Sequence, residues 1–203
     1  MLYKSTRGYD KKFKASEAVI KGLCDDGGLF VPESFPTLSV PIEKLSMLDY
    51  KETAYVVLKE YFTDYSEEEL RNCINKAYDS KFDTEEMAPL VKKGDKYFLE
   101  LFHGKTIAFK DMALSILPHL LTTALKKNNI WVYGAHMEGE SCITADLSGA
   151  VALVIGSEGK GISKLTKEKC DKLIKIPMVG EINSLNASVA AGIIMYEVMK
   201  TRL

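Results

Sequence analysis

A glycine-rich segment in the last third of the chain has the residue types of a ligand-binding loop. Gly156-Ser157-Glu158-Gly159-Lys160-Gly161 follows Val151 to Ile155, an apolar run that is typical of a buried parallel strand. A P-loop would need four residues between its first glycine and Gly-Lys-Ser/Thr. Here two residues intervene and Gly161 follows the lysine, so the spacing excludes a P-loop.

Lys110 is a second residue that could carry chemistry, because a positioned amine can form an imine with a carbonyl cofactor. Considered without its neighbours, it is one of many lysines, and a solvated lysine at a helix start is the default interpretation. His136 has no partner at ligand spacing, so we expect a surface histidine in a loop and no metal site.

The segments around the glycine-rich loop alternate between strand and helix. Strands are predicted over 130–133, 151–155 and 173–176, with a helix over 165–172 and a turn at 177–180. Asn183 and Ser184 are expected to cap a final helix that buries Leu185, Val189 and Ile193 on one face. This α/β pattern places the loops at the carboxyl ends of strands, where open sheets bind ligands.

The first 130 residues predict a mixture of helices and short strands. Helical spacing is weak over 8–21 and clear over 50–62, and Ser66 with Glu69 fits a capping box for a helix that runs to Tyr78. Strands are predicted over 29–31, ending at Pro32, and over 96–101. A helix over 110–127 contains Pro118, which is expected to kink the helix or to reset its start.

The composition is that of a soluble globular protein: 203 residues, 46% apolar and 27% charged. Residues 131–203 carry eight basic and eight acidic residues, so no basic excess marks an RNA-binding region. The four cysteines lack C-x-x-C spacing, which indicates free thiols in a reducing cytoplasm. The N-terminus lacks a signal-peptide pattern and the longest apolar stretch is too short to cross a bilayer, so we expect no membrane contact.

Three segments in the first 130 residues resemble threonine synthase in order and spacing. They are Ser5-Thr6-Arg7-Gly8, Asp26 to Pro32, and Phe102-His103-Gly104-Lys105-Thr106-Ile107-Ala108-Phe109-Lys110-Asp111, where the family usually has proline in place of Lys105. The resemblance implies that Lys110 would form the Schiff base with pyridoxal phosphate and that O-phosphohomoserine would be the substrate. It also implies a phosphate-binding loop soon after the next helix, where this chain has Trp131-Val132-Tyr133-Gly134.

Residues 131–203 resemble the C-terminal part of the SpoU (TrmH-like) RNA 2′-O-methyltransferases. The matching segments are Gly156 to Ser163, Ile176 to Gly180 and Ser184 to Ala190. In that family such loops form a trefoil-knot pocket for S-adenosylmethionine, and RNA is the substrate. The resemblance implies a cofactor pocket formed by Gly156, Glu158, Gly159, Gly161, Ile176, Met178, Ser184, Leu185 and Asn186.

The resemblance implies that Glu158 and Asn186 would order these loops or help to place the ribose during catalysis. The alternative for Glu158 is an acid that only structures its loop. The alternative for Ser184 is a cap of the last helix with no catalytic part.

Neither a Gly/Ser-rich nor a Pro-rich linker separates the two parts. We expect a threonine synthase-like α+β region over 1–130 to meet a partial SPOUT α/β half-domain over 131–203, with the join inside Leu125 to Ile130. Each resemblance leaves its site incomplete, because the methyltransferase motif with an Asn-Leu-Gly segment and an activating arginine would lie upstream of Ile130. Recombination, a deliberate chimera or an erroneous gene assembly would each produce such a join.

Three functions therefore stay open. The first is the S-adenosylmethionine-binding part of an rRNA or tRNA 2′-O-ribose methyltransferase, with a homodimer through the C-terminal region. The second is a pyridoxal phosphate-dependent threonine synthase that converts O-phosphohomoserine to threonine. The third is a catalytically inactive hybrid with open sheet edges.

Overall fold

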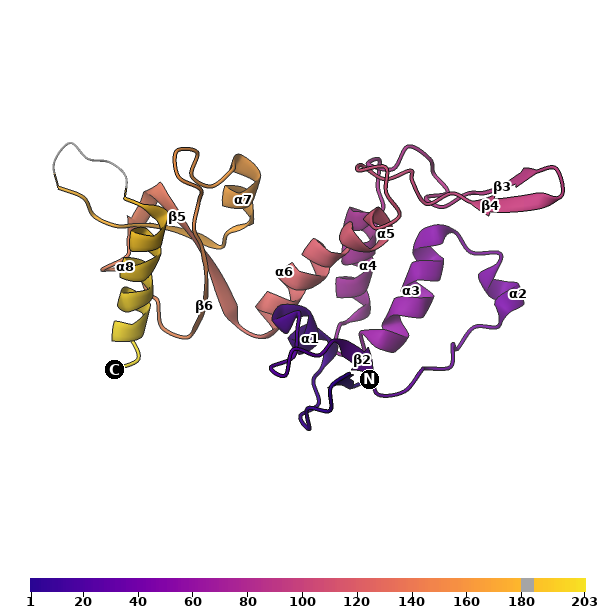
Figure 1. The fold of residues 1–203 in the computed structure, drawn as a ribbon, viewed down its shortest axis with the longest axis horizontal. Coiled ribbons are helices and arrows are strands. Elements are labelled where there is room, and N and C mark those ends of the chain that lie inside the picture. The colour runs from indigo at the N-terminus through magenta and orange to yellow at the C-terminus, as the bar shows by residue number, and fades with distance from the viewer. Residues whose placement is uncertain (180–184) are drawn as a thin grey trace. The chain divides into compact units, whose positions relative to one another are not determined.

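The computed structural model describes residues 1–179 and 185–203, and the chain divides into two compact units (Figure 1). Unit 1 is Met1–Asn128 and unit 2 is Asn129–Leu203. Each unit has its own buried apolar core, which includes Leu70 in unit 1 and Ile174 in unit 2. The predicted mixed α/β architecture in two parts is confirmed. Among the described helices, none is both long and apolar enough to cross a bilayer.

Unit 1 begins with two short antiparallel strands and a helix between them: β1 (Tyr3–Ser5), α1 (Ala15–Lys21) and β2 (Phe30–Pro32). The Asp26 carboxylate holds the loop before β2, since it accepts hydrogen bonds from Ser5 Oγ at 2.8 Å and from the Gly28 N–H at 2.9 Å. A Cβ on Gly28 would lie 2.0 Å from Ser5 Oγ, so this close approach requires glycine. The predicted strand that ends at Pro32 is confirmed, whereas β1 was not predicted.

Three helices follow: α2 (Ile42–Leu45), α3 (Tyr50–Tyr61) and α4 (Glu67–Ala77). The short α2 buries no residue, whereas α3 and α4 contribute to the core of unit 1. The predicted capping box starts α4. Ser66 Oγ accepts from the Glu69 N–H at 3.1 Å, and the Glu69 carboxylate accepts from the Ser66 N–H at 2.7 Å. The helical spacing of α4 buries Leu70, Cys73, Ile74 and Ala77 on one face.

A β-hairpin follows, formed by β3 (Leu90–Lys93) and β4 (Lys96–Leu99). The strand predicted over 96–101 is confirmed in its first four residues. Its partner β3 was missed, because Leu90-Val91-Lys92-Lys93 shows no alternation of apolar and polar residues. Gly94 has a φ of 64° in the two-residue turn, a conformation that glycine adopts without strain.

Two helices replace the single helix predicted over 110–127: α5 (Asp111–Leu114) and α6 (Leu117–Lys127). Pro118 lies in the first turn of α6, so it resets the helix start, which is one of the two outcomes expected from the sequence. The missing N–H of proline costs little there, because first-turn N–H groups have no acceptor within the helix.

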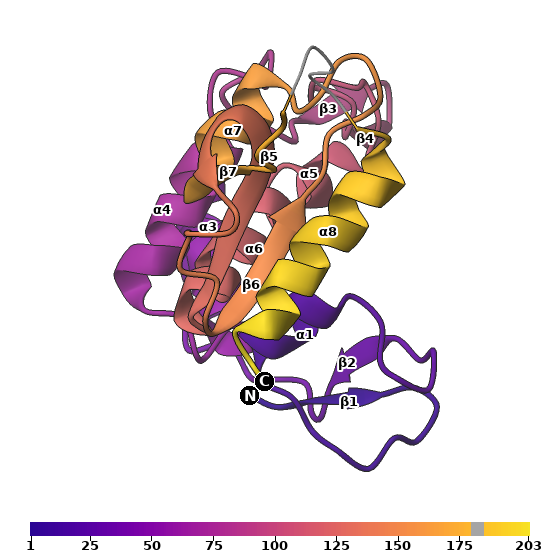
Figure 2. The ribbon, with the colours of Figure 1, turned by 90° about the vertical axis from the view of Figure 1, so that its left-hand side faces the viewer.

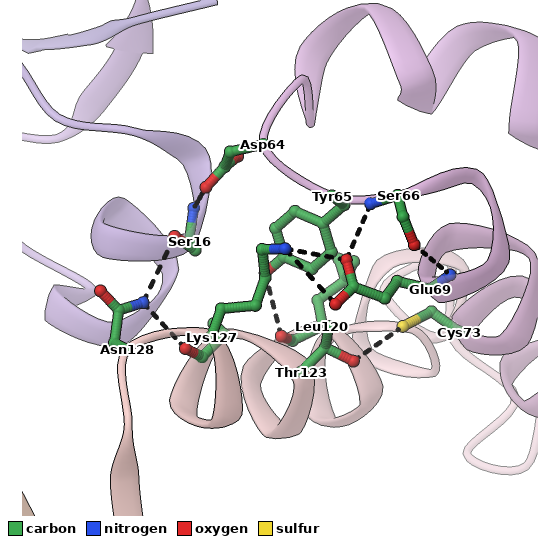
Figure 3. Close-up of polar contacts among 11 residues, drawn as sticks. Ser16, Asp64, Tyr65, Ser66, Glu69, Cys73, Leu120, Thr123, Lys127 and Asn128 are labelled. Carbon is green, nitrogen blue, oxygen red and sulfur yellow. Dashed lines mark hydrogen bonds and ion pairs between the residues drawn. The ribbon is translucent and has the colours of Figure 1, made fainter.

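Polar contacts fasten α6 to the rest of unit 1 (Figure 3). The Tyr65 hydroxyl donates to the Leu120 carbonyl at 3.0 Å, and Lys127 Nζ lies 3.0 Å from the Glu69 carboxylate. Asn128 ends the helix, and its side-chain amide donates to Ser16 Oγ at 3.4 Å. The α6 helix is therefore a structural part of unit 1.

Unit 2 is a three-stranded parallel sheet with α8 packed along one face (Figure 2). The strand order is β6–β5–β7. Its elements are β5 (Ile130–Ser141), β6 (Ala150–Val154), α7 (Lys164–Lys169), β7 (Lys172–Lys175) and α8 (Ala187–Lys200). All three predicted strands are confirmed in position.

The β5 strand runs well past its predicted end at residue 133, through an irregularity between Ala135 and Glu140. A Cβ on Gly139 would lie 2.5 Å from the backbone nitrogen of Ile174, so glycine lets this irregular stretch lie against β7. His136 is therefore in a strand, and its predicted position in a loop was wrong. Its Nδ1 accepts from the Glu138 N–H at 3.2 Å.

The last helix differs from the prediction in its buried face. Ile194 and Val198 are the buried residues of α8, whereas Val189 is 51% exposed and Leu185 precedes the helix. The cap in the structure is Asn186, and the predicted caps Asn183 and Ser184 lie outside the described residues. The helix starts three residues later than a cap at Asn183 would give, and packing against the sheet selects the face with Ile194 and Val198.

Candidate functional site

The parallel sheet of unit 2 places the predicted cofactor-loop residues at the carboxyl end of its strands. The glycine-rich loop follows β6, and Ile176 and Met178 follow β7. Ile176 packs against the core, Met178 is 38% exposed and Leu185 is partly buried. Ser184 lies outside the described residues. The sheet therefore positions these loops at the edge where parallel α/β sheets bind ligands.

The glycine-rich loop closes on itself. The Ser157 N–H donates to the Gly161 carbonyl at 3.2 Å, and the Gly161 N–H donates back to the Ser157 carbonyl at 2.9 Å. Gly159 and Gly161 have φ values of 84° and 64°, in the left-handed region that glycine reaches without strain. The two predicted glycines are therefore turn-forming residues that give the loop its shape.

Gly156 has a different role, because the loop backbone at Gly161 and Ile162 lies directly against it. A Cβ at this position would lie 2.2 Å from the carbonyl carbon of Gly161 and 2.4 Å from the nitrogen of Ile162. Both neighbours are backbone atoms, so they cannot turn aside as a side chain could. Glycine at position 156 is therefore required by the packing of the loop against itself.

One hydrogen bond ties the loop to the start of α8. The Asn186 side-chain amide donates to the Glu158 carboxylate, while its oxygen accepts from the Ser188 N–H at 3.0 Å and the Val189 N–H at 3.3 Å. Asn186 therefore caps α8 and holds Glu158 with the same side chain. This contact supports a loop-ordering role for Glu158, which is one of the two roles expected for it. A catalytic part for Glu158 or Asn186 stays a prediction.

Substitutions can separate the two contributions of Asn186, its hydrogen bond to Glu158 and its cap of α8. Asn186→Ala removes both, and we expect a loss of about 1 kcal/mol of unfolding free energy from the missing cap. Asn186→Asp keeps a capping oxygen but places a carboxylate beside Glu158, so stability should recover while the loop opens. Hydrogen exchange of the Ser157 to Gly161 amides measures the opening. Equal protection of these amides in the Asp variant and the unaltered chain would contradict the tie.

Lys110 belongs to unit 1, where it is exposed at the start of α5. The loop before it is built around the buried carboxylate of Asp111, which accepts from the Thr106 hydroxyl at 2.6 Å and the Thr106 N–H at 2.7 Å. These bonds hold the pKa of Asp111 below its usual range. Gly104 leaves room for that carboxylate, since a Cβ there would lie 2.6 Å from Asp111 Oδ2. The segment is thus ordered, with Lys110 facing solvent.

His103, for which no sequence pattern predicted a role, lies between two carboxylates in unit 1. Its Nδ1 is 2.5 Å from Asp83 Oδ1 and its Nε2 is 2.9 Å from Glu100 Oε2. Glu100 precedes His103 by three residues, so the sequence contained a local signal for this contact. Asp83 is distant in the sequence and reaches His103 only through the fold. Across the described ranges, 1–179 and 185–203, no group of three His, Cys, Asp or Glu side chains is arranged to hold a metal ion.

Two family models match different parts of the chain. Residues 2–78 match the threonine synthase N terminus, and residues 114–196 match the SpoU rRNA methylase family. The chain thus joins a threonine synthase-like segment to a SpoU methylase-like segment, as its motifs predicted. The second match begins at Leu114 and includes α6, which packs within unit 1.

The chain also resembles individual RNA methyltransferases. The 23S rRNA (guanosine-2′-O-)-methyltransferase RlmB of Xanthomonas campestris is 49% identical over 80 residues, which are 39% of this chain and 32% of that protein. The chain spans about a third of the length of the curated relatives it matches.

Solved threonine synthases resemble the fold. A PLP-bound threonine synthase from Brucella melitensis aligns with a TM-score of 0.57 at 29% identity, over 75% of this chain and 34% of that one. The threonine synthase from yeast gives the same TM-score of 0.57 at 28% identity, over 96% of this chain and 42% of that one. The chain therefore covers less than half of each.

Proposed function

We propose that unit 2 binds S-adenosylmethionine and derives from the donor-binding part of an RNA 2′-O-ribose methyltransferase. The observation that carries the proposal is the backbone crossing at Gly156, in a loop that Glu158 and Asn186 tie to α8. The same residues lie in the segment that matches the SpoU rRNA methylase family. Ile176 packs against the core and Leu185 is partly buried, so both would offer apolar surface to the adenine ring of the cofactor.

When bound, S-adenosylmethionine supplies an electrophilic methyl group. The backbone around Gly156, with Ile176, Met178 and Leu185, would hold it, and Glu158 and Asn186 would keep the loop closed. Transfer to a ribose hydroxyl also needs a group that activates the hydroxyl. The one arginine in the sequence of unit 2 is Arg202, which donates to the Gly149 carbonyl at 2.9 Å, at the opposite end of β6 from the loop.

We therefore infer that unit 2 binds the methyl donor without turning it over. Titration calorimetry of the whole chain with S-adenosylmethionine should give saturable heat, while incubation with labelled donor and ribosomal or transfer RNA should leave the RNA unlabelled. Absence of saturable heat would refute donor binding. Labelled RNA would refute the inactive hybrid and establish a methyltransferase with RNA as its partner.

The second candidate is a threonine synthase-like protein that binds pyridoxal phosphate and acts on O-phosphohomoserine. It is favoured by the ordered segment that presents Lys110 at the start of α5. The site does not fit the whole cofactor, because α6 leads through Asn128 into β5, where the expected phosphate-binding loop would begin. We therefore derive no catalytic step through this cofactor.

Lys110→Ala tests that candidate. Because Lys110 is exposed and lacks a phosphate loop beside it, we expect any imine absorbance with pyridoxal phosphate to be weak. Lys105→Ala is the matched control, since Lys105 is exposed in the same segment. Strong absorbance that disappears in Lys110→Ala and persists in Lys105→Ala would favour the threonine synthase function over our proposal.

The remaining features of the proposal concern assembly and origin. Exposed apolar side chains on α8, Val189, Met195, Tyr196 and Met199, support a homodimer through unit 2. The four free cysteines support a reducing cytoplasm. A join inside Leu125 to Ile130 is supported by the boundary between units at Asn128 and Asn129. Long-read sequencing of the source locus would test it, since two separate full-length genes would refute a natural fusion.

A further inference from the structure

The imidazole of His103 connects three segments of unit 1. Its two ring nitrogens face Asp83, in the loop after α4, and Glu100, directly after β4. The Asp83 N–H also donates to the His103 carbonyl at 3.1 Å. The ring stacks on Phe102 with centroids 4.7 Å apart, and only 14% of the His103 side chain is exposed. This geometry fixes the ring between the two carboxylates.

Both carboxylates are acceptors when ionised, so both ring nitrogens must donate to satisfy them. A neutral imidazole carries one N–H, and its other nitrogen would turn a lone pair toward a carboxylate. Only the imidazolium makes both bonds. Asp83 and Glu100 are the charged groups that act on the ring, and both favour its protonated form. The nitrogens point to opposite sides, which excludes chelation of one metal ion by the three side chains.

We propose that protonated His103 is a pH-sensitive lock. Its two hydrogen bonds hold the start of the Phe102–Asp111 segment, which contains Lys110, against the end of the β3–β4 hairpin and the loop after α4. Gly104, the next residue, is buried and accepts a backbone hydrogen bond from Ile107, so a displacement of His103 is transmitted into this segment. Loss of the proton leaves one N–H on the ring, so only one of the two hydrogen bonds persists and the three segments are no longer all held together. The lock lies in unit 1 and does not depend on donor binding by unit 2.

The direction of the pH effect follows from the two carboxylates. The hydrogen bond to Glu100, and to a smaller extent the one to Asp83, raises the pKa of His103 above its ordinary value of about 6.5. The folded state therefore holds the proton more tightly than the unfolded chain. The stabilisation is fully present below about pH 6.5 and is lost as pH rises through the raised pKa of the folded protein.

Hydrogen exchange of the whole chain between pH 6 and 9, corrected for the intrinsic pH dependence of exchange, tests the lock. We expect the protection of the β3, β4 and 104–110 amides to fall on the order of fivefold across this range, as loss of one hydrogen bond predicts. His103→Gln should make the protection independent of pH. Glu100→Gln keeps the side-chain shape and should move the midpoint to lower pH.

His136→Gln is the control, because His136 lies in unit 2 and its Nδ1 accepts from a backbone N–H. It should leave the pH profile of the hairpin unchanged. The lock is overturned if His103→Gln retains the pH profile of the unaltered chain, or if Glu100→Gln leaves the midpoint in place. Nuclear magnetic resonance titration of the His103 ring gives a second readout, and a midpoint at or below pH 6.5 would also overturn it.

Discussion

Gly156→Ala should weaken S-adenosylmethionine binding by at least about 100-fold, or about 2.7 kcal/mol. The new methyl group would lie 2.2 Å from the carbonyl carbon of Gly161, closer than non-bonded carbon atoms approach. Because the obstacle is backbone, relief requires the whole loop from Ser157 to Gly161 to move. That movement would break the paired hydrogen bonds that close the loop. Titration calorimetry of the variant and the unaltered chain measures the effect.

Gly192→Ala is the matched control in the same unit. Gly192 lies inside α8, and a Cβ there meets no atom within 4 Å. Alanine is favoured over glycine in a helix by about 1 kcal/mol, so this variant should be as stable as the unaltered chain or more so. Its affinity for S-adenosylmethionine should not change. Equal losses of affinity in both variants would show that the close backbone contact between Gly156 and Gly161 has no specific role in donor binding.

Leu70→Ala and Ile174→Ala should each destabilise one unit and leave the other unchanged. Leu70 is 1% exposed in the core of unit 1, and Ile174 is 0% exposed in the core of unit 2. Removing a large aliphatic side chain from such a position costs about 2–5 kcal/mol, from lost burial and the cavity left behind. Because the two cores share no residue, each loss should stay within its own unit.

The sole tryptophan makes this separation measurable. Trp131 lies in β5, so its fluorescence reports the unfolding of unit 2, whereas far-ultraviolet circular dichroism reports both units. Leu70→Ala should lower the circular dichroism transition of unit 1 and leave the tryptophan midpoint in place. Ile174→Ala should lower the tryptophan midpoint. If Leu70→Ala moved the tryptophan midpoint as far as Ile174→Ala does, the two units would unfold as one.

Elements with strong local signals could be predicted from the sequence. The Ser66 and Glu69 capping box specifies the start of α4 through two hydrogen bonds within one turn. The apolar run that ends at Ile155 specifies a parallel strand, although β6 lies at an edge of the sheet of the described residues and is only partly buried. The glycines after it specify a turn. Such features depend on residues within a few positions of each other, so the sequence alone contains their physical cause.

Features that depend on distant residues could not be predicted in the same way. The length of β5 is set where Gly139 lies against the β7 backbone, and His103 acquires Asp83 as a partner only through the fold. The buried face of α8 was mispredicted because apolar residues occur on several faces of this helix, and only packing against the sheet selects Ile194 and Val198. Residues 180–184, including the predicted site residue Ser184, are outside the described structure.

The boundary between the units lies at a change from helix to strand. Asn128 ends α6, Asn129 has a φ of 52°, and Ile130 begins β5. Asparagine tolerates this left-handed conformation better than other residues with a Cβ, and it commonly ends helices. A helix end followed by a strand is an ordinary α/β connection. The backbone between the two units therefore has an ordinary helix-to-strand geometry.

The most direct test of a two-unit hybrid with a methyl-donor site in unit 2 is differential scanning calorimetry of the whole chain with and without S-adenosylmethionine. We expect two transitions, and ligand at 100 times its dissociation constant should stabilise unit 2 by about 2.7 kcal/mol. Only the transition that Ile174→Ala identifies as unit 2 should therefore rise, on the order of 10 °C. A thermogram that the ligand leaves unchanged, or a ligand-induced rise in the unit 1 transition alone, would contradict this account.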